Sequence, residues 1–240
     1  MKKREAARKI ESMELDIGDK ANILLVKFGL KPNCFLEVRS ANLNYFNRAR
    51  ELFLLPDVFL EGIVEQLQSL EVNLIVGAKE KYNLHKRSLA YPQFKRPSIE
   101  LAKVCVGDNA AELSELLSHK FTLEVQPTPE YHMRLGELLG YPYSARYAFA
   151  YDKTRLAKHK GFSDEIRRRP YDRGLDVFKF FQFLPTKHYF ATEIDLAKKI
   201  HDIIRQYLPD IYEKIVRFQE RMSEEKATEE MVKFLYTSPI

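Results

Sequence analysis

The stretches VNLIVG (residues 72–77) and IELAKVCVGDNAAELSELLS (residues 99–118) decide the fold class. Each begins with a short apolar run that contains β-branched residues, which is typical of a buried strand. In the second stretch Gly107, Asp108 and Asn109 mark a turn, and the residues after them favour a helix over residues 110–118. The sequence therefore predicts a small α/β element instead of a full doubly wound sheet.

The segments before this element are mostly helical by pattern. Residues 33–38 (NCFLEV) form a candidate third strand, and residues 78–97, with much charge and two prolines, predict a long surface loop. The apolar side chains after Pro56 recur at helical spacing, as on a helix with one buried face. The predicted helices are a fraying helix or loose arm over residues 2–13, one capped by Asp19 that runs through Phe28, one over residues 41–54, and one that Pro56 opens, with the stripe Phe59, Ile63, Leu67 and Leu70.

The chain is helical by pattern from Thr128 onward. Thr128 is a predicted N-cap and Pro129 the first helical residue, where a missing N–H leaves no hydrogen bond unmade. Gly140 ends this helix, and Pro142 starts the next, which runs to about Lys158. Further on, Thr192 and Asp195 resemble a capping box that opens a helix to about Tyr207, and Ile211, Ile215, Phe218 and Met222 mark another.

These patterns predict an α+β fold that is predominantly helical. A small two- to three-stranded sheet belongs to the N-terminal half, and the C-terminal half is helical. Pro127 and Pro129 interrupt the pattern, so we expect an α/β part over residues 1–125 and a helical part over residues 126–240, as two parts or one continuous domain.

The charge is unevenly distributed along the chain. Residues 1–9 carry +4, and residues 79–103 and 153–173 carry +5 each. These segments hold +14 together, which leaves −9 for the rest of a chain whose net charge is +5. A polarised surface of this kind favours acidic partners.

The two longer basic segments also contain aromatic residues, such as Tyr91 and Phe94 in the first and Phe162 and Tyr171 in the second. Basic side chains neutralise phosphates and aromatic rings stack on unpaired bases, so the segments favour binding of RNA or another polyanion. The alternative is a charged surface of ion-pair networks, as in thermophile proteins. The nucleic-acid-binding candidates are Lys86, Arg87, Lys95, Arg96, Lys158, Lys160, Arg167, Arg168, Arg169 and Arg173.

The segment HMRLGELLGYP (residues 132–142) indicates a second candidate site. Gly136 lies inside a predicted helix, where it costs up to about 1 kcal/mol relative to Ala, so we expect a close contact with another backbone. Polar side chains surround it, and they suggest an enzyme or a small-ligand-binding protein with a pocket at this corner. The alternative is a tightly packed helical hairpin with a surface ion pair. The ligand-binding candidates are His132, Arg134, Glu137 and Tyr141.

The same motif, LGELLGYP, resembles the signature of an uncharacterised archaeal domain-of-unknown-function family, number 483. In that family Leu-Gly-x-x-Leu-Gly-Tyr-Pro is often followed by cysteines, whereas Tyr143, Ser144 and Ala145 follow it here. A second family-like stretch, from Pro185 to Ala197, also lacks cysteines. The resemblance covers residues 125–205. It implies no activity, and a metal or redox role of those cysteines would be absent from this chain.

Several other classes have no support in the sequence. No apolar run approaches the roughly 20 residues that span a bilayer, and the basic N-terminus has no apolar stretch after it, as a secretory signal would. The two cysteines and six histidines form no metal-ligand spacing, so no metal site and no cofactor is predicted. Gly107 and Asp108 precede a helix and could hold an anion there, but Asp108 favours a cap instead.

The expected compartment is the cytoplasm, because Cys34 and Cys105 are predicted to be free thiols and Cys105 to be inert. There is no nucleotide-binding loop and no nucleophile elbow, which leaves open whether the protein is an enzyme. A third hypothesis is an interaction scaffold that self-associates through its C-terminal helices.

Overall fold

The computed structural model describes residues 1–39, 58–83, 98–119, 125–151, 186 and 189–216, and it divides the chain into two compact units, Met1–Val125 and Gln126–Ile240. The fold is mixed α+β and mostly helical, with a three-stranded antiparallel sheet in the first unit. This confirms the predicted fold class. The helix predicted over residues 41–54, Pro56 and most of the loop predicted over residues 78–97 lie outside the described residues.

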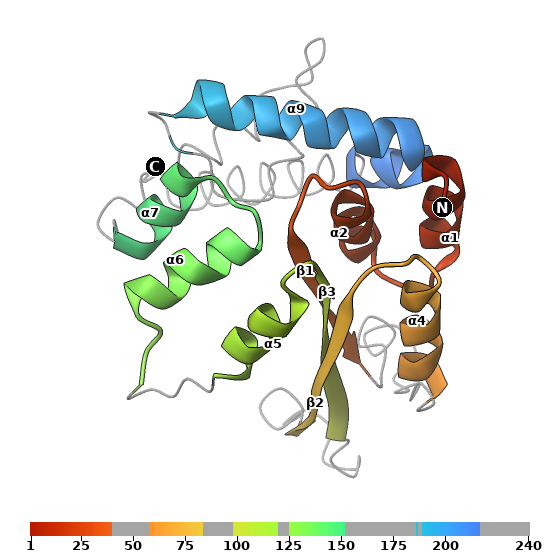
Figure 1. Ribbon diagram of the computed structural model, residues 1–240, viewed down its shortest axis with the longest axis horizontal. Helices are drawn as coiled ribbons and strands as arrows, with labels where there is room; N and C mark the ends of the chain where they lie inside the picture. Colours follow the sequence, from red (N-terminus) through yellow and green to blue (C-terminus); the bar gives the residue numbers. More distant parts are fainter. Residues whose placement is uncertain (40–57, 84–97, 120–124, 152–185, 187–188, 217–240) are drawn as a thin grey trace, which may run out of the picture. The chain divides into compact units, whose positions relative to one another are not determined.

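The sheet has the order β1-β3-β2, with β3 (Ser98–Gly107) between β1 (Asn33–Arg39) and β2 (Leu74–Asn83) (Figure 1). The candidate third strand is therefore confirmed as β1. The start of the predicted loop was wrong, because β2 continues to Asn83. The register shifts between Val76 and Lys79, and this bulge carries the strand past Gly77. Charged residues are tolerated beyond it because β2 is an edge strand.

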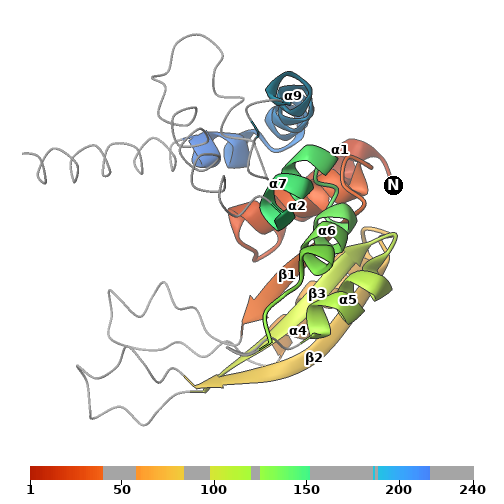
Figure 2. The same cartoon turned by 90° about the vertical axis from the view of Figure 1, so that its left-hand side faces the viewer.

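The two faces of the sheet are packed differently. Paired residues share a face, and on one face Cys34, Leu36, Val104 and Val106 are all at most 1% exposed. The helix α5 (Ala110–Ser118) covers the opposite face, where Ser114 hydrogen-bonds Cys105. Figure 2 shows α5 in front of the strands, with α2 and α4 on the other side. The apolar core therefore lies between the sheet and the N-terminal helices.

Three helices supply the other half of this core: α1 (Lys3–Ser12), α2 (Ile17–Lys27) and α4 (Val58–Gln68). The α1 segment is a packed helix and no loose arm, because Ala6, Ala7 and Ile10 are buried. The helix α2 begins with Asp16 as N-cap, three residues before the predicted cap Asp19. Of the predicted α4 stripe, the side chains of Ile63, Leu67 and Leu70 are buried. This burial confirms the spacing argument.

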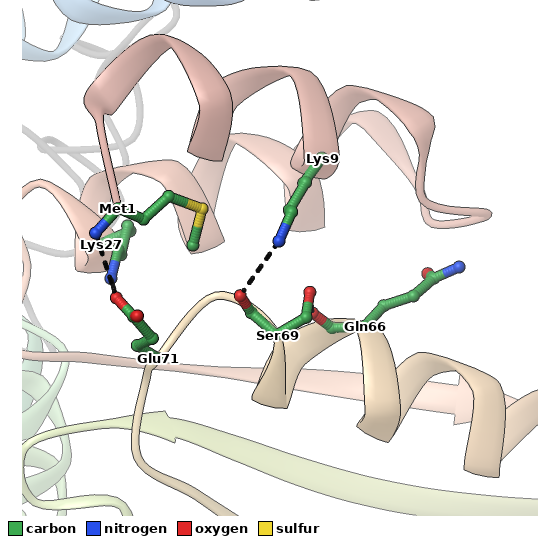
Figure 3. A network of polar contacts seen from close by, with 6 residues as sticks. All are labelled: Met1, Lys9, Lys27, Gln66, Ser69 and Glu71. Atoms are coloured by element: carbon green, nitrogen blue, oxygen red, sulfur yellow. Dashed lines mark hydrogen bonds and ion pairs between the residues drawn. The ribbon is translucent and has the colours of Figure 1, made fainter.

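Polar contacts join α1 and α2 to the end of α4 (Figure 3). The Lys9 Nζ donates to the Ser69 carbonyl at 3.4 Å, and the Met1 amino group lies 3.2 Å from a Glu71 carboxylate oxygen. Lys27 reaches the same oxygen at 3.8 Å. The hydrogen bond from the Met1 amino group, its charge and that of Lys27 lower the pKa of Glu71. These contacts surround Glu71 where its φ is +57°, a left-handed backbone that terminates α4.

The turn between β3 and α5 depends on Gly107. Its φ is +132°, and a Cβ there would lie 2.2 Å from the Pro32 carbonyl oxygen. The Asn109 N–H donates to the side-chain oxygen of the buried Asn33 at 2.8 Å, so β1 caps α5 from across the turn. The expected cap from Asp108 was wrong, since Asp108 only donates its N–H to the Pro32 carbonyl. Because Asn33 occupies the Asn109 amide, the turn does not present that amide to an anion.

Lys31 is a charged group inside this unit, at 7% exposure, and its Nζ donates to the Asn22 side chain at 3.0 Å. Burial lowers the pKa of Lys31 from 10.5 to about 8, partly offset by Cys34. The unfolded chain therefore binds more protons than the folded one above about pH 8, and stability rises with pH there. Burial raises the pKa of Cys34 to about 12 and that of Cys105 to about 11, so stability falls again above about pH 9.

We expect the free energy of unfolding of this unit to increase by about 0.5 kcal/mol between pH 7 and pH 9, because Lys31 adds about 1.3 kcal/mol and the two thiols remove about 0.8 kcal/mol. The Lys31→Met variant should instead lose about 0.8 kcal/mol over the same range. Urea unfolding at both pH values measures it. Met has similar length and no titrating group, so the variant isolates the Lys31 charge. Equal pH dependence in the two proteins would show that Lys31 is not the group responsible.

Candidate nucleic-acid interface

The second unit begins with a helical hairpin of α6 (Pro129–Leu138) and α7 (Tyr143–Tyr151). The Thr128 hydroxyl oxygen accepts the Tyr131 N–H at 3.2 Å, which confirms the predicted N-cap. At the other end the Tyr141 N–H donates to the Gly136 carbonyl and the Gly140 N–H to the Glu137 carbonyl. These bonds form a Schellman motif, and Gly140 supplies its left-handed residue with φ +74°. The LGELLGYP segment therefore forms the end of α6 and the turn into α7.

Gly136 makes room for an arginine of the second helix. A Cβ on Gly136 would lie 2.7 Å from Cγ and 3.1 Å from Cδ of Arg146. The expectation of a close backbone contact was wrong, because the neighbour is this side chain. The Arg146 alkyl chain therefore crosses α6 at Gly136, where no side chain blocks it, and the Arg146 side chain is only 15% exposed.

The four ligand-binding candidates fall into separate groups. Arg134 and Glu137 are exposed and form an ion pair at 2.8 Å. His132 lies about 140° around the helix from Glu137, and its ring packs edge-on against Phe149, with 5.0 Å between centroids. Tyr141 is half-buried beside Gly136, and burial raises its pKa. The hairpin thus brings Arg134 and Glu137 together and turns His132 toward Phe149.

The burial pattern of α7 is the reverse of an ordinary amphipathic helix. Its buried residues are alanines, Ala145, Ala148 and Ala150. Its large aromatic residues point outward: Tyr143, Tyr147 and Tyr151, which we call the tyrosine row, are 63%, 50% and 47% exposed. Burying a large apolar side chain stabilises a fold by about 1.5–3 kcal/mol, so exposed rings contribute little to the fold. A row of them indicates an interaction surface.

The rings of the tyrosine row are ordered with respect to one another. The centroids of Tyr143 and Tyr147 are 6.0 Å apart with 26° between the planes, and those of Tyr147 and Tyr151 are 5.0 Å apart at 35°. The Tyr151 hydroxyl donates to Glu130 at 3.2 Å. Desolvation and this carboxylate raise the pKa of Tyr151. The three phenols therefore pack on one another as a continuous, half-exposed aromatic row along one side of α7.

Arg146 lies at the N-terminal end of the row, with its guanidinium carbon 5.6 Å from the Tyr143 ring centre. Its Nη1 has two long contacts, 3.5 Å to the Met133 carbonyl and 3.6 Å to Glu137. Its Nε is buried and has no hydrogen-bond partner among the described residues. Arg146 thus places a mostly buried guanidinium next to an exposed aromatic ring.

A buried carboxylate holds α7 to the helix α9 (Phe190–Tyr207). Glu193 is 1% exposed and accepts hydrogen bonds from the Ser144 hydroxyl at 2.5 Å, from the Thr186 N–H at 2.6 Å and from the Thr186 hydroxyl at 2.8 Å. The capping box read from Thr192 and Asp195 was wrong, because α9 starts earlier, at Phe190. Its predicted end at Tyr207 is confirmed, and residues 209–216 form a further helix.

The ten basic residues predicted to bind nucleic acid all lie outside the described residues, in 84–97 and 152–185. The structure therefore describes the α6–α7 hairpin and α9, but not the charged segments. Sequence reasoning missed the tyrosine row, although the pattern Tyr-x-x-x-Tyr-x-x-x-Tyr over residues 143–151 places the three rings on one helix face. It also missed Glu193, whose partners are seven and 49 residues away.

Other chemistry has little support in the described part of the chain. Among those residues no cluster of three His, Cys, Asp or Glu side chains is placed to hold a metal ion. Within the same residues no helix has the length and apolarity to cross a membrane. Cys34 and Cys105 are free, as predicted; both are buried, and they point to opposite faces of the sheet. Their raised pKa values keep both thiols protonated and unreactive.

No protein-family model, curated protein or solved structure matches this chain. The resemblance carried by LGELLGYP thus gains no support from these comparisons.

Proposed function

We propose that this protein binds RNA through the tyrosine row of α7 and the basic segment that begins at residue 153. The observation that carries the proposal is the exposure of Tyr143, Tyr147 and Tyr151 as one ordered row. Aromatic rings stack on unpaired bases with about 1–3 kcal/mol per base, and they do so with every base type. An exposed row of phenols directly before a basic segment combines the two components of such a surface.

The two components have separate roles. Residues 126–151 contain two basic and two acidic residues, so the hairpin has no net charge and its main contribution is stacking. Residues 153–173 carry +5 and supply the charge that neutralises phosphates. Arg146 lies on the hairpin beside Tyr143 and adds a planar cation there. The proposal includes a cytoplasmic location, which is consistent with two free, buried thiols.

Reversal of the charges at Arg167, Arg168 and Arg169 to Glu tests the electrostatic part of the proposal. We expect RNA binding to weaken by at least about 10-fold near physiological salt. The slope of log K against log salt should fall by about 2, because each phosphate contact with a single strand contributes about 0.7. Fluorescence anisotropy with a labelled single-stranded RNA over a salt series measures both quantities.

The matched control reverses Lys2, Arg4 and Arg8, which are exposed on or next to α1 and change the net charge by the same amount. The control should leave the slope within about 0.5 of the wild type. If both triple variants weaken binding equally, the effect is that of net charge alone and the proposed site is wrong.

A further inference from the structure

We infer that Arg134 and Arg146 form a binding site for one backbone phosphate of the RNA, and that the Glu137 carboxylate occupies this site in the free protein. The inference rests on the proposed function and deepens it by placing a phosphate contact beside the turn between α6 and α7. Glu137 is then an internal competitor that the RNA displaces, so removal of its charge should strengthen binding.

Both basic residues of the hairpin lie next to the same atom. Residues 126–151 contain only two basic residues, Arg134 and Arg146. The Arg134 Nη1 is 2.8 Å from the Glu137 Oε2, and the Arg146 Nη1 is 3.6 Å from the same oxygen. One guanidinium comes from each helix, so an anionic oxygen at this point meets two positive charges. Arginine binds phosphate oxygens with the same guanidinium donors that it uses for carboxylates.

Glu137 is held only weakly at this position. Its side chain is 53% exposed and that of Arg134 is 45% exposed. Solvent screens such a pair, so its loss changes an equilibrium by a factor of about five at most. The hydrogen bond from Arg134 and the charges of both arginines lower the pKa of Glu137, so neutralising it requires a substitution instead of a mild change of pH. A phosphate delivered by a bound strand can therefore replace Glu137 at little cost.

The second arginine contributes mainly its charge. Arg146 is only 15% exposed, and its Nη1 has long contacts, 3.5 Å to the Met133 carbonyl and 3.6 Å to Glu137. Its Nε has no hydrogen-bond partner among the described residues. A mostly buried guanidinium with only long contacts favours an anion beside it, because its charge is poorly compensated. The exposed Arg134 supplies the direct hydrogen bond to that anion.

The site adjoins the tyrosine row. The Arg146 guanidinium carbon is 5.6 Å from the ring centre of Tyr143, the first residue of the row. The basic segment that begins at residue 153 follows the last residue of the row, Tyr151. A phosphate between Arg134 and Arg146 therefore adds a positive contact at the end of the row that is farther along the sequence from the basic segment.

The test measures binding of labelled single-stranded RNA to the full chain by fluorescence anisotropy over a salt series. The variants are Glu137→Gln, Arg134→Gln and the two substitutions together. The matched control is Asp195→Asn on α9, which also removes one negative charge from an exposed ion pair between residues three apart on a helix. Circular dichroism checks that every variant keeps the helix content of the wild type.

We expect Glu137→Gln to bind RNA about three- to five-fold more tightly than the wild type, because the RNA no longer displaces an ion pair. The slope of log K against log salt should steepen by about 0.7, the value of one phosphate contact. Arg134→Gln should weaken binding, and Asp195→Asn should stay within about two-fold of the wild type. In the Arg134→Gln background the gain from Glu137→Gln should shrink to the size of the control effect.

Two results would overturn this inference while salt-dependent RNA binding by the wild type persists. The first is a Glu137→Gln protein that binds RNA more weakly than the wild type or no more tightly than Asp195→Asn. The second is an equal gain from Glu137→Gln with and without Arg134, since the effect would then be that of net charge alone. Absence of RNA binding by the wild type would overturn the proposed function itself.

Discussion

Replacing Gly107 with Ala is expected to destabilise the first unit by at least about 4 kcal/mol, a loss at the upper end of what single substitutions cause. The φ of +132° is strained for any residue with a side chain, which costs about 1–3 kcal/mol. In addition, the new Cβ would lie 2.2 Å from the Pro32 carbonyl oxygen and 2.7 Å from the Asn33 Cα. Both atoms belong to the backbone, so β1 must move and the Asn33 cap of α5 is lost.

Urea unfolding gives the stability, and hydrogen exchange of the β1 and β3 amides assigns the loss to the first unit. The control is Gly62→Ala within α4. A Cβ added at Gly62 would meet no neighbouring group within 4 Å and its φ is not positive, so we expect a gain of about 0.5–1 kcal/mol from helix propensity. A Gly107→Ala protein as stable as the wild type would contradict the described turn.

Replacing Glu193 with Ala is expected to destabilise the second unit by about 3 kcal/mol. The substitution leaves the Ser144 hydroxyl and two donors of Thr186 without their acceptor, and an unsatisfied buried polar group costs about 1–3 kcal/mol. The Glu193→Gln variant retains one acceptor oxygen and should lose only about 1 kcal/mol. Hydrogen exchange of the α7 and α9 amides measures both losses in this unit.

The control for Glu193 is Asp195→Ala on the same helix. Asp195 is exposed and its carboxylate lies 3.4 Å from Lys198, an arrangement that contributes little to stability. We expect a change below about 0.5 kcal/mol. A larger loss of stability for Asp195→Ala than for Glu193→Ala would support the capping box predicted from the sequence. It would contradict the stabilising role of the buried Glu193 carboxylate.

The fold was predictable where local signals determine it. Thr128 and Pro129 start α6 and Gly140 ends it because caps and left-handed residues act over one turn of chain. The run over residues 99–118 gives β3 and α5 for the same reason. The errors arose where residues far apart in the sequence determine the structure. Asn33 in β1 caps the helix α5, and β2 continues past Gly77 because β3 pairs with it.

The candidate site was less predictable. The polar residues around Gly136 suggested a pocket, but helical spacing alone places His132 on a different face from Glu137. Whether the tyrosines of α7 point outward depends on tertiary packing, in which the small alanines face inward. Glu193 looked like any acidic residue in the first turn of a helix, and only the three-dimensional structure brings Ser144 and Thr186 to it.

The most direct test of RNA binding is a titration of the wild-type protein with single-stranded RNA and with heparin, each at low and at high salt. Heparin carries comparable charge but no bases, so it measures the basic segments without the tyrosine row. The proposal predicts tighter binding to RNA than to heparin, a steep loss of both with salt, and a residual preference for RNA at high salt because stacking is not screened. Equal binding to the two polymers at every salt concentration, or binding to neither, would contradict it.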